Sequence, residues 1–105
     1  MLELHVLGSP TAILDGKPLS GALLSKDLAL LYYLAITGQP QPRASLAVLL
    51  WGENSESAAR SNLRKSISEL RQQFGDHLEI ERDYVSLVQT HCAVDLWEFE
   101  RLAAS

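Results

Sequence analysis

One stretch of the chain, residues 57–75 (SAARSNLRKSISELRQQFG), restricts the possible folds more than any other. Its apolar residues recur every three or four positions, which is the spacing of one stripe along an α-helix. These residues are Ala59, Leu63, Ile67, Leu70 and Phe74. A helix with a single apolar stripe buries that side against a core and leaves the other side in water. The rest of the chain must therefore build a core on one side of this helix only.

The other side of the predicted helix is basic and polar. The residues opposite the stripe or flanking it are Arg60, Ser61, Asn62, Arg64, Lys65, Ser68, Arg71 and Gln72. Arg and Lys bind phosphates or guanine edges in the major groove of DNA, while Asn and Gln suit adenine. This side fits a DNA groove, although an ordinary solvated surface helix has a similar composition. We assign Arg64 and Lys65 to base edges, and Arg60 and Arg71, nearer the apolar side, to phosphates.

The net charge of the 105-residue chain is −4, which is unusual for a nucleic-acid-binding domain. The charge is unevenly distributed, however. Between Glu56 and Phe74, four basic residues stand against two acidic ones, a local net charge of +2. Most of the acidic excess follows Gly75. The basic helix is therefore compatible with DNA despite the overall charge.

Length and composition indicate a single domain in the cytoplasm. A chain of 105 residues supports one modest core. Met1 runs straight into a strand pattern, so no signal peptide is predicted, and the longest apolar run is too short to span a membrane. The single cysteine, Cys92, fits a reducing compartment. We therefore expect a cytoplasmic protein with no membrane partner.

The N-terminal third is predicted to contain a small antiparallel sheet and one helix. Apolar and polar residues alternate over residues 2–6, and two further strands are predicted at 11–14 and 17–19. Between these two strands, Asp15-Gly16 is a strong hairpin signal. A helix then runs from a Ser25 N-cap to Thr37 and ends at Gly38.

Two helices joined by a tight turn follow an extended connector at residues 39–42. Residues 43–51 are predicted as a short helix with Leu46, Leu49 and Leu50 facing inward. Residues 52–55 form the turn, and Ser55 caps the basic helix. After that helix, residues 78–81 and 84–88 pair as a hairpin in which Ile80 faces Val85.

This order predicts an α+β winged helix-turn-helix. It has an N-terminal antiparallel β-sheet, a three-helix core and a C-terminal β-hairpin wing. The basic helix is the third helix of the core. Residues 1–90 form this domain, and residues 91–105 are predicted to be a linker and the start of a following helical domain.

The chain resembles the DNA-binding domain of the SARP-type bacterial transcriptional activators, a branch of the OmpR/PhoB-type winged-helix regulators. The matching stretches are residues 4–8 (LHVLG) with Asp15-Gly16, 31–35 (LYYLA), 46–51 (LAVLLW), 58–64 (AARSNLR), 70–71 (LR) and 94–99 (VDLWEF). The resemblance implies that the third helix enters the major groove. It also implies that the wing, with Arg82 and Tyr84, touches the backbone or the minor groove.

The same resemblance implies the partners and the context of the domain. They are double-stranded DNA with promoter repeats, RNA polymerase and a second copy of the protein on DNA. In that family, the segment corresponding to residues 94–99 leads into a helical bacterial transcriptional activation domain. The function expected is sequence-specific DNA binding by a transcriptional regulator that activates promoters.

An enzyme is not expected, and neither is a cofactor or a metal. His5, His77 and His91 are scattered, and the adjacent pair His91-Cys92 lacks the spacing of metal ligands. The alternative to DNA binding is a winged helix that binds another protein. It is favoured by the net charge of −4 and by Glu79 and Glu81, which alternate onto the exposed side of the wing, where they would repel phosphates.

Overall fold

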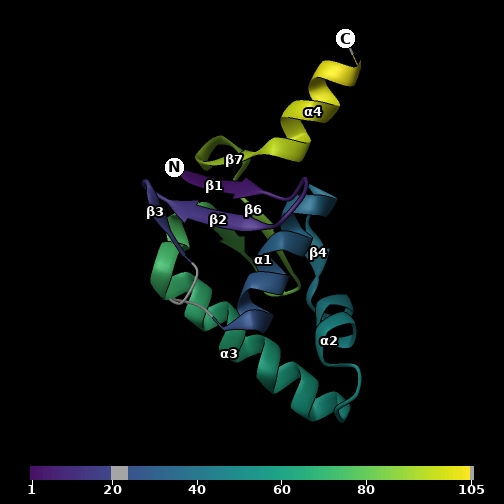
Figure 1. Cartoon of the computed structure of the whole chain (residues 1–105). Coiled ribbons are helices and arrows are strands. Elements are labelled where there is room, and N and C mark those ends of the chain that lie inside the picture. The colour runs from purple at the N-terminus through teal and green to yellow at the C-terminus, as the bar shows by residue number, and fades with distance from the viewer. Residues whose placement is uncertain (20–23, 105) are drawn as a thin grey trace.

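The computed structural model describes residues 1–19 and 24–104, and these form an α+β fold (Figure 1). β1 (Leu2–His5), β2 (Thr11–Leu14) and β3 (Lys17–Pro18) pair antiparallel as predicted. β7 (Cys92–Val94) then pairs with β1 in parallel, in the order β3-β2-β1-β7. The sheet is therefore mixed and not purely antiparallel. Alternation within the N-terminal segment cannot reveal a strand that comes from the far end of the chain.

The segment predicted to be a linker contributes to this sheet. Cys92–Val94 forms β7, and α4 (Asp95–Ala104) begins immediately after it. Residue 105, the last of the predicted second segment, lies outside the described residues. A chain cut after residue 90 would lose one of the four strands of the sheet.

The second sheet joins the predicted hairpin to a strand that was not predicted. β5 (Leu78–Ile80) and β6 (Tyr84–Leu87) pair with Leu78 opposite Leu87 and Ile80 opposite Val85, which confirms the predicted register. β4 (Gln41–Pro42) lies on the other side of β6, with Pro42 opposite Tyr84. β4 has only two residues, and the second is a proline, so it shows no alternation of apolar and polar residues. The sequence therefore indicated only an extended connector here.

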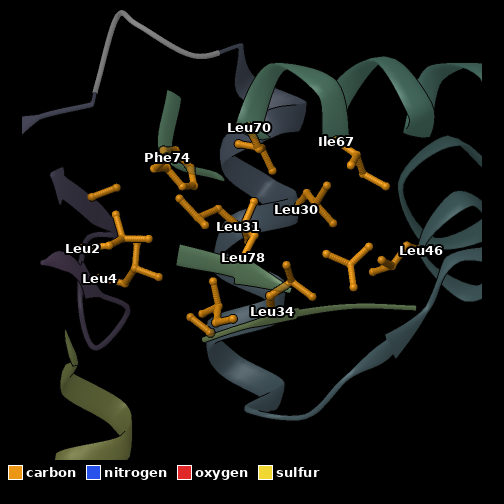
Figure 2. Close-up of a cluster of buried hydrophobic side chains, with 14 of the residues drawn as sticks. Leu2, Leu4, Leu30, Leu31, Leu34, Leu46, Ile67, Leu70, Phe74 and Leu78 are labelled. Atoms are coloured by element: carbon orange, nitrogen blue, oxygen red, sulfur yellow. The ribbon is translucent and has the colours of Figure 1, made fainter. Parts of the chain in front are cut away.

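Three helices have the predicted extents. α1 (Ser25–Thr37) lies between the N-terminal sheet and α3 (Glu56–Phe74), and α2 (Arg43–Trp51) precedes α3 (Figure 1). All five predicted stripe residues of α3 are buried. Figure 2 shows three of them, Ile67, Leu70 and Phe74. They pack in one core with Leu30, Leu31 and Leu34 of α1 and with Leu2 and Leu4 of β1. The prediction for α2 was wrong at Leu49, which is 52% exposed, while Ala47 is buried in its place.

The helix ends follow the predicted signals in two of three cases. Ser55 Oγ accepts a hydrogen bond from the Ala58 amide at 3.1 Å, which confirms the cap of α3. Gly38 ends α1 with a left-handed φ of 64°, and its amide donates to Leu34 O. The N-cap prediction at Ser25 was wrong: Leu24 is the N-cap, Ser25 is already helical, and the Leu24 side chain forms no capping hydrogen bond.

The start of α4 is fixed to the body of the domain by two side chains. The Trp97 indole donates to Ala35 O at 2.7 Å, beside Gly38 at the end of α1. Asp95 Oδ1 accepts from the Val6 amide at 2.8 Å and from the Leu96 amide, and Oδ2 accepts from the Leu7 amide at 3.2 Å. Burial raises the pKa of Asp95, but these amide donors lower it by more, so the net pKa is depressed. Beyond this attachment, α4 extends away from the other helices (Figure 1).

Among the described residues, no helix has both the length and the apolar character needed to cross a membrane.

Candidate nucleic-acid interface

α3 presents a long basic surface to solvent. It has 19 residues, and at about 1.5 Å per residue it is roughly 28 Å long. Six of the eight residues predicted on its outer side are exposed: Arg60, Arg64, Lys65, Ser68, Arg71 and Gln72. We call these six residues the basic surface of α3. The other two, Ser61 and Asn62, are half-buried.

The cations of this surface are largely free of protein partners. Arg64, Lys65 and Arg71 form no hydrogen bond or ion pair with any residue in the described ranges 1–19 and 24–104. Arg60 lies 3.8 Å from Glu56 in an exposed i,i+4 pair, which contributes only a few tenths of a kcal/mol. An exposed pair of this strength is readily exchanged for a phosphate. All four cations can therefore reach an external anion.

α2 and α3 are held at a fixed separation by the turn at residues 52–55. The Asn54 amide donates to Trp51 O at 3.0 Å, and a Cβ at Gly52 would lie 2.5 Å from Val48 O. Only glycine fits at this point without a shift of the backbone. On the α1 side, Lys26 Nζ donates to Leu50 O at 2.6 Å and lies 6.0 Å from the centre of the Trp51 ring. Trp51 is half-buried against the core.

The β5–β6 hairpin presents a different chemistry from the basic surface of α3. Arg82 is exposed at its tip, but it is flanked by the exposed carboxylates of Glu81 and Asp83. The Tyr84 hydroxyl donates to Glu79 Oε1 at 3.0 Å, and this hydrogen bond raises the pKa of Tyr84. Of the two predicted hairpin contacts, only Arg82 is therefore free to meet a phosphate. Among described residues, no hydrogen bond or ion pair joins this hairpin to the basic surface of α3.

Arg43, the first residue of α2, links this helix to the hairpin by two hydrogen bonds that the sequence did not predict. Its amide donates to Asp83 O and its Nε donates to Glu81 O, each at 2.9 Å. Both contacts are to backbone carbonyls of the hairpin tip, so they fix the position of the tip relative to the start of α2. A single arginine at a helix start gave no signal of this contact, because both acceptors are backbone carbonyls distant in sequence.

The chain matches no protein-family model, no curated protein and no solved structure.

His77 and His91 are 14 residues apart in the sequence but are neighbours in space. The His77 and His91 rings lie 5.9 Å apart, edge to face, and His91 Nδ1 lies 2.8 Å from Asp76 O. Cys92 is nearby, and burial raises the pKa of its thiol to about 11, so the thiol is protonated at neutral pH. In the described part of the chain, no three His, Cys, Asp or Glu residues are grouped so that they could hold a metal ion.

Proposed function

We propose that this chain is a winged helix-turn-helix domain that binds duplex DNA in a bacterial transcriptional regulator, with α3 in the major groove. In this proposal α2 and α3 are the helix-turn-helix, the β5–β6 hairpin is the wing, and the regulator is an activator of the SARP type.

The observation that supports the proposal is that three of the four cations on α3 form no ion pair among the described residues. Surface Arg and Lys residues often neutralise neighbouring carboxylates, yet Arg64, Lys65 and Arg71 have no such partner among the described residues. The opposite side of the same helix is buried in the core. A rigid, capped helix with unpaired cations on one side is the form of a groove-reading helix.

The net charge of −4 is compatible with this role because the field at the contact depends on local charge. Salt screens exposed charges beyond a Debye length of about 8 Å at physiological ionic strength. The acidic residues after Gly75 therefore weaken non-specific attraction more than they weaken contacts at α3. We expect a binder with modest affinity for random DNA, whose specific affinity comes from paired copies on promoter repeats.

A second candidate function is recognition of another protein through the same helix pair. Val48 is 69% exposed, and together with Ala47 and Trp51 it lines a shallow apolar groove between α2 and α3. The acidic hairpin also favours this alternative. The two functions predict different results with DNA, because a protein-binding module should show little affinity for DNA at any salt concentration.

Titration against mixed-sequence duplex DNA at two salt concentrations tests the proposal. A DNA-binding domain releases counterions, so its affinity should fall steeply as salt rises. On mixed-sequence DNA, where no base contact is specific, each of the four cations of the basic surface can contact a phosphate. For about four such contacts, the slope of log K against log salt should be roughly −3.6. Absence of measurable binding at about 50 mM salt would reject DNA binding in favour of the protein-binding alternative.

Substitutions on α3 should separate base reading from phosphate contact. We expect Lys65→Ala to weaken binding to the selected site by about 1–3 kcal/mol and to relax its discrimination, because it removes a base-edge contact. Arg71→Ala should weaken binding to all sequences alike and reduce the salt slope by about one unit. Both residues are exposed, so neither change should unfold the domain. Unchanged site binding by Lys65→Ala, Arg64→Ala and their double variant would show that α3 is not the reader.

We assign the turn between α2 and α3 to RNA polymerase, because Glu53 and Asn54 are exposed there. Replacing both with alanine should lower promoter activation in a transcription assay with the full-length regulator while DNA affinity stays unchanged. Equal loss of activation and affinity would instead place this turn in folding or in DNA docking. Ser57→Ala, an exposed change just inside α3, is the matched control.

A further inference from the structure

A buried hydrogen bond joins α3 to α1 near the middle of α3. Ser66 Oγ donates to Asp27 Oδ1 at 2.5 Å, and each residue is only 4% exposed. Within residues 1–19 and 24–104, it is the only side-chain hydrogen bond or ion pair that links α3 to another helix or strand. The residue next to Ser66 in the chain is Lys65, which is exposed and lies about 100° away around the helix axis.

The remaining contact between α1 and α3 is apolar. Ile67 and Leu70 of α3 pack in the same cluster as Leu30 of α1 (Figure 2). The hydrophobic effect has no directional preference, and an apolar core that keeps its volume and pattern can lose a unique arrangement before it loses stability. A roll of about 20° at the helix surface, about 5–6 Å from the axis, moves a side chain by about 2 Å. That displacement exceeds the range of about 0.5 Å over which a hydrogen bond to a base is good.

The Asp27 carboxylate has one hydrogen-bond partner, Ser66, among the residues that the structure describes. No described residue donates a hydrogen bond to Oδ2, although this oxygen is buried. Removing a carboxylate from water costs several kcal/mol, and one hydrogen bond does not fully offset this. A pair of apolar side chains of similar volume would stabilise the fold as well or better. Stability alone therefore does not explain the pair, whereas a directional contact between the two helices does.

We propose that Asp27 and Ser66 are positioning residues that set the rotation of α3 about its own axis, and so determine which of its side chains reach base edges. This inference rests on the proposed function. In this proposal the Asp27–Ser66 hydrogen bond does not contact DNA. It affects the discrimination between DNA sequences, and not the affinity for DNA in general. Phosphate contacts by long Arg and Lys side chains tolerate the same rotation because they are not tied to base geometry.

The test compares two variants of the same pair. Asp27→Leu with Ser66→Ala replaces the hydrogen bond with an apolar contact, and Asp27→Asn keeps an oxygen that accepts from Ser66. Each is measured for unfolding in urea, for affinity to a duplex selected from a random pool by the parent protein, and for affinity to scrambled duplex. Asp27→Ala with Ser66→Ala adds no bulk and gives the same test if the leucine does not fit.

We expect the apolar pair to unfold at a urea concentration equal to or above that of the parent. Its ratio of selected to scrambled affinity should fall about tenfold, the discrimination of roughly one base pair. Affinity for scrambled duplex should change less than about twofold, and Asp27→Asn should keep the parent ratio within about threefold. Residual dipolar couplings should show α3 rotated relative to α1 in the apolar pair without DNA.

Other results overturn the inference in distinguishable ways. An unchanged affinity ratio with an unrotated α3 would show that apolar packing alone orients the helix, while the proposed function stands. Loss of folding in both apolar pairs would show that the hydrogen bond serves stability. No salt-dependent binding of the parent to any duplex would remove the proposed function and this inference together.

Discussion

Replacing Leu70 with alanine is expected to lower the free energy of unfolding by about 3–5 kcal/mol, because the change leaves a cavity at a fully buried position. Leu70 is 0% exposed and projects from α3 into the cluster that contains Leu30 and Leu31 of α1 (Figure 2). Buried side chains of α3, α1 and β1 belong to this one cluster, so we expect the surrounding chain to collapse only partly into the space. Urea unfolding followed by circular dichroism measures the loss.

The loss should be large relative to the total stability of a small domain, about 5–15 kcal/mol. Gln72→Ala is the matched control, because Gln72 lies two residues away on the same helix and is exposed. Its effect should stay within about 0.5 kcal/mol. A loss below about 1 kcal/mol for Leu70→Ala would contradict the burial of this side of α3.

Replacing Asp95 with alanine is expected to lower the free energy of unfolding by about 2–4 kcal/mol, because the amides of Val6 and Leu7 lose a charged acceptor. The side chain is one quarter exposed, which keeps the effect below that of two fully buried charge-assisted bonds. Glu98→Ala is the control within α4, since its pairing with Arg101 is exposed and contributes little.

The same contact makes stability depend on pH. The pKa of Asp95 is lower in the folded chain than in the unfolded chain, where it is about 3.9. Its contribution is therefore complete above about pH 5 and is lost as the pH falls through the folded pKa. The stability difference between parent and Asp95→Asn should shrink between pH 5 and pH 2, and a constant difference would contradict the assigned contact.

The sequence predicted the parts of the fold that depend on local pattern. Three features follow from the spacing of residues that are close in sequence. They are the apolar stripe of α3, the hairpin register of β5 and β6, and the Ser55 cap. Each of these signals arises from residues that are neighbours in the final structure. The exposed side of α3 could be predicted from the same local spacing, and six of the eight residues assigned to it are exposed.

What the sequence did not predict depends on partners that are distant along the chain. β7 carries only three residues, and β4 only two, so each is a strand only because of the strand beside it. The spacing of Leu49 from Leu46 predicted that it faces the core. In the structure, Leu46 and Ala47 are the buried residues of α2, and Leu49 is exposed. The Ser66–Asp27 bond was missed because serine on a helix usually indicates solvent, and the carboxylate lies 39 residues away.

The parallel pairing of β1 with β7 affects how the chain folds during its synthesis. Leu2 leaves the ribosome about 90 residues before its partner Cys92. At about 5–20 residues per second, β1 waits roughly 5–20 s for that partner. During this time the β1–β2–β3 meander has an open edge that can pair with other chains. Closure of the sheet therefore comes late, and contacts of such long sequence separation slow folding.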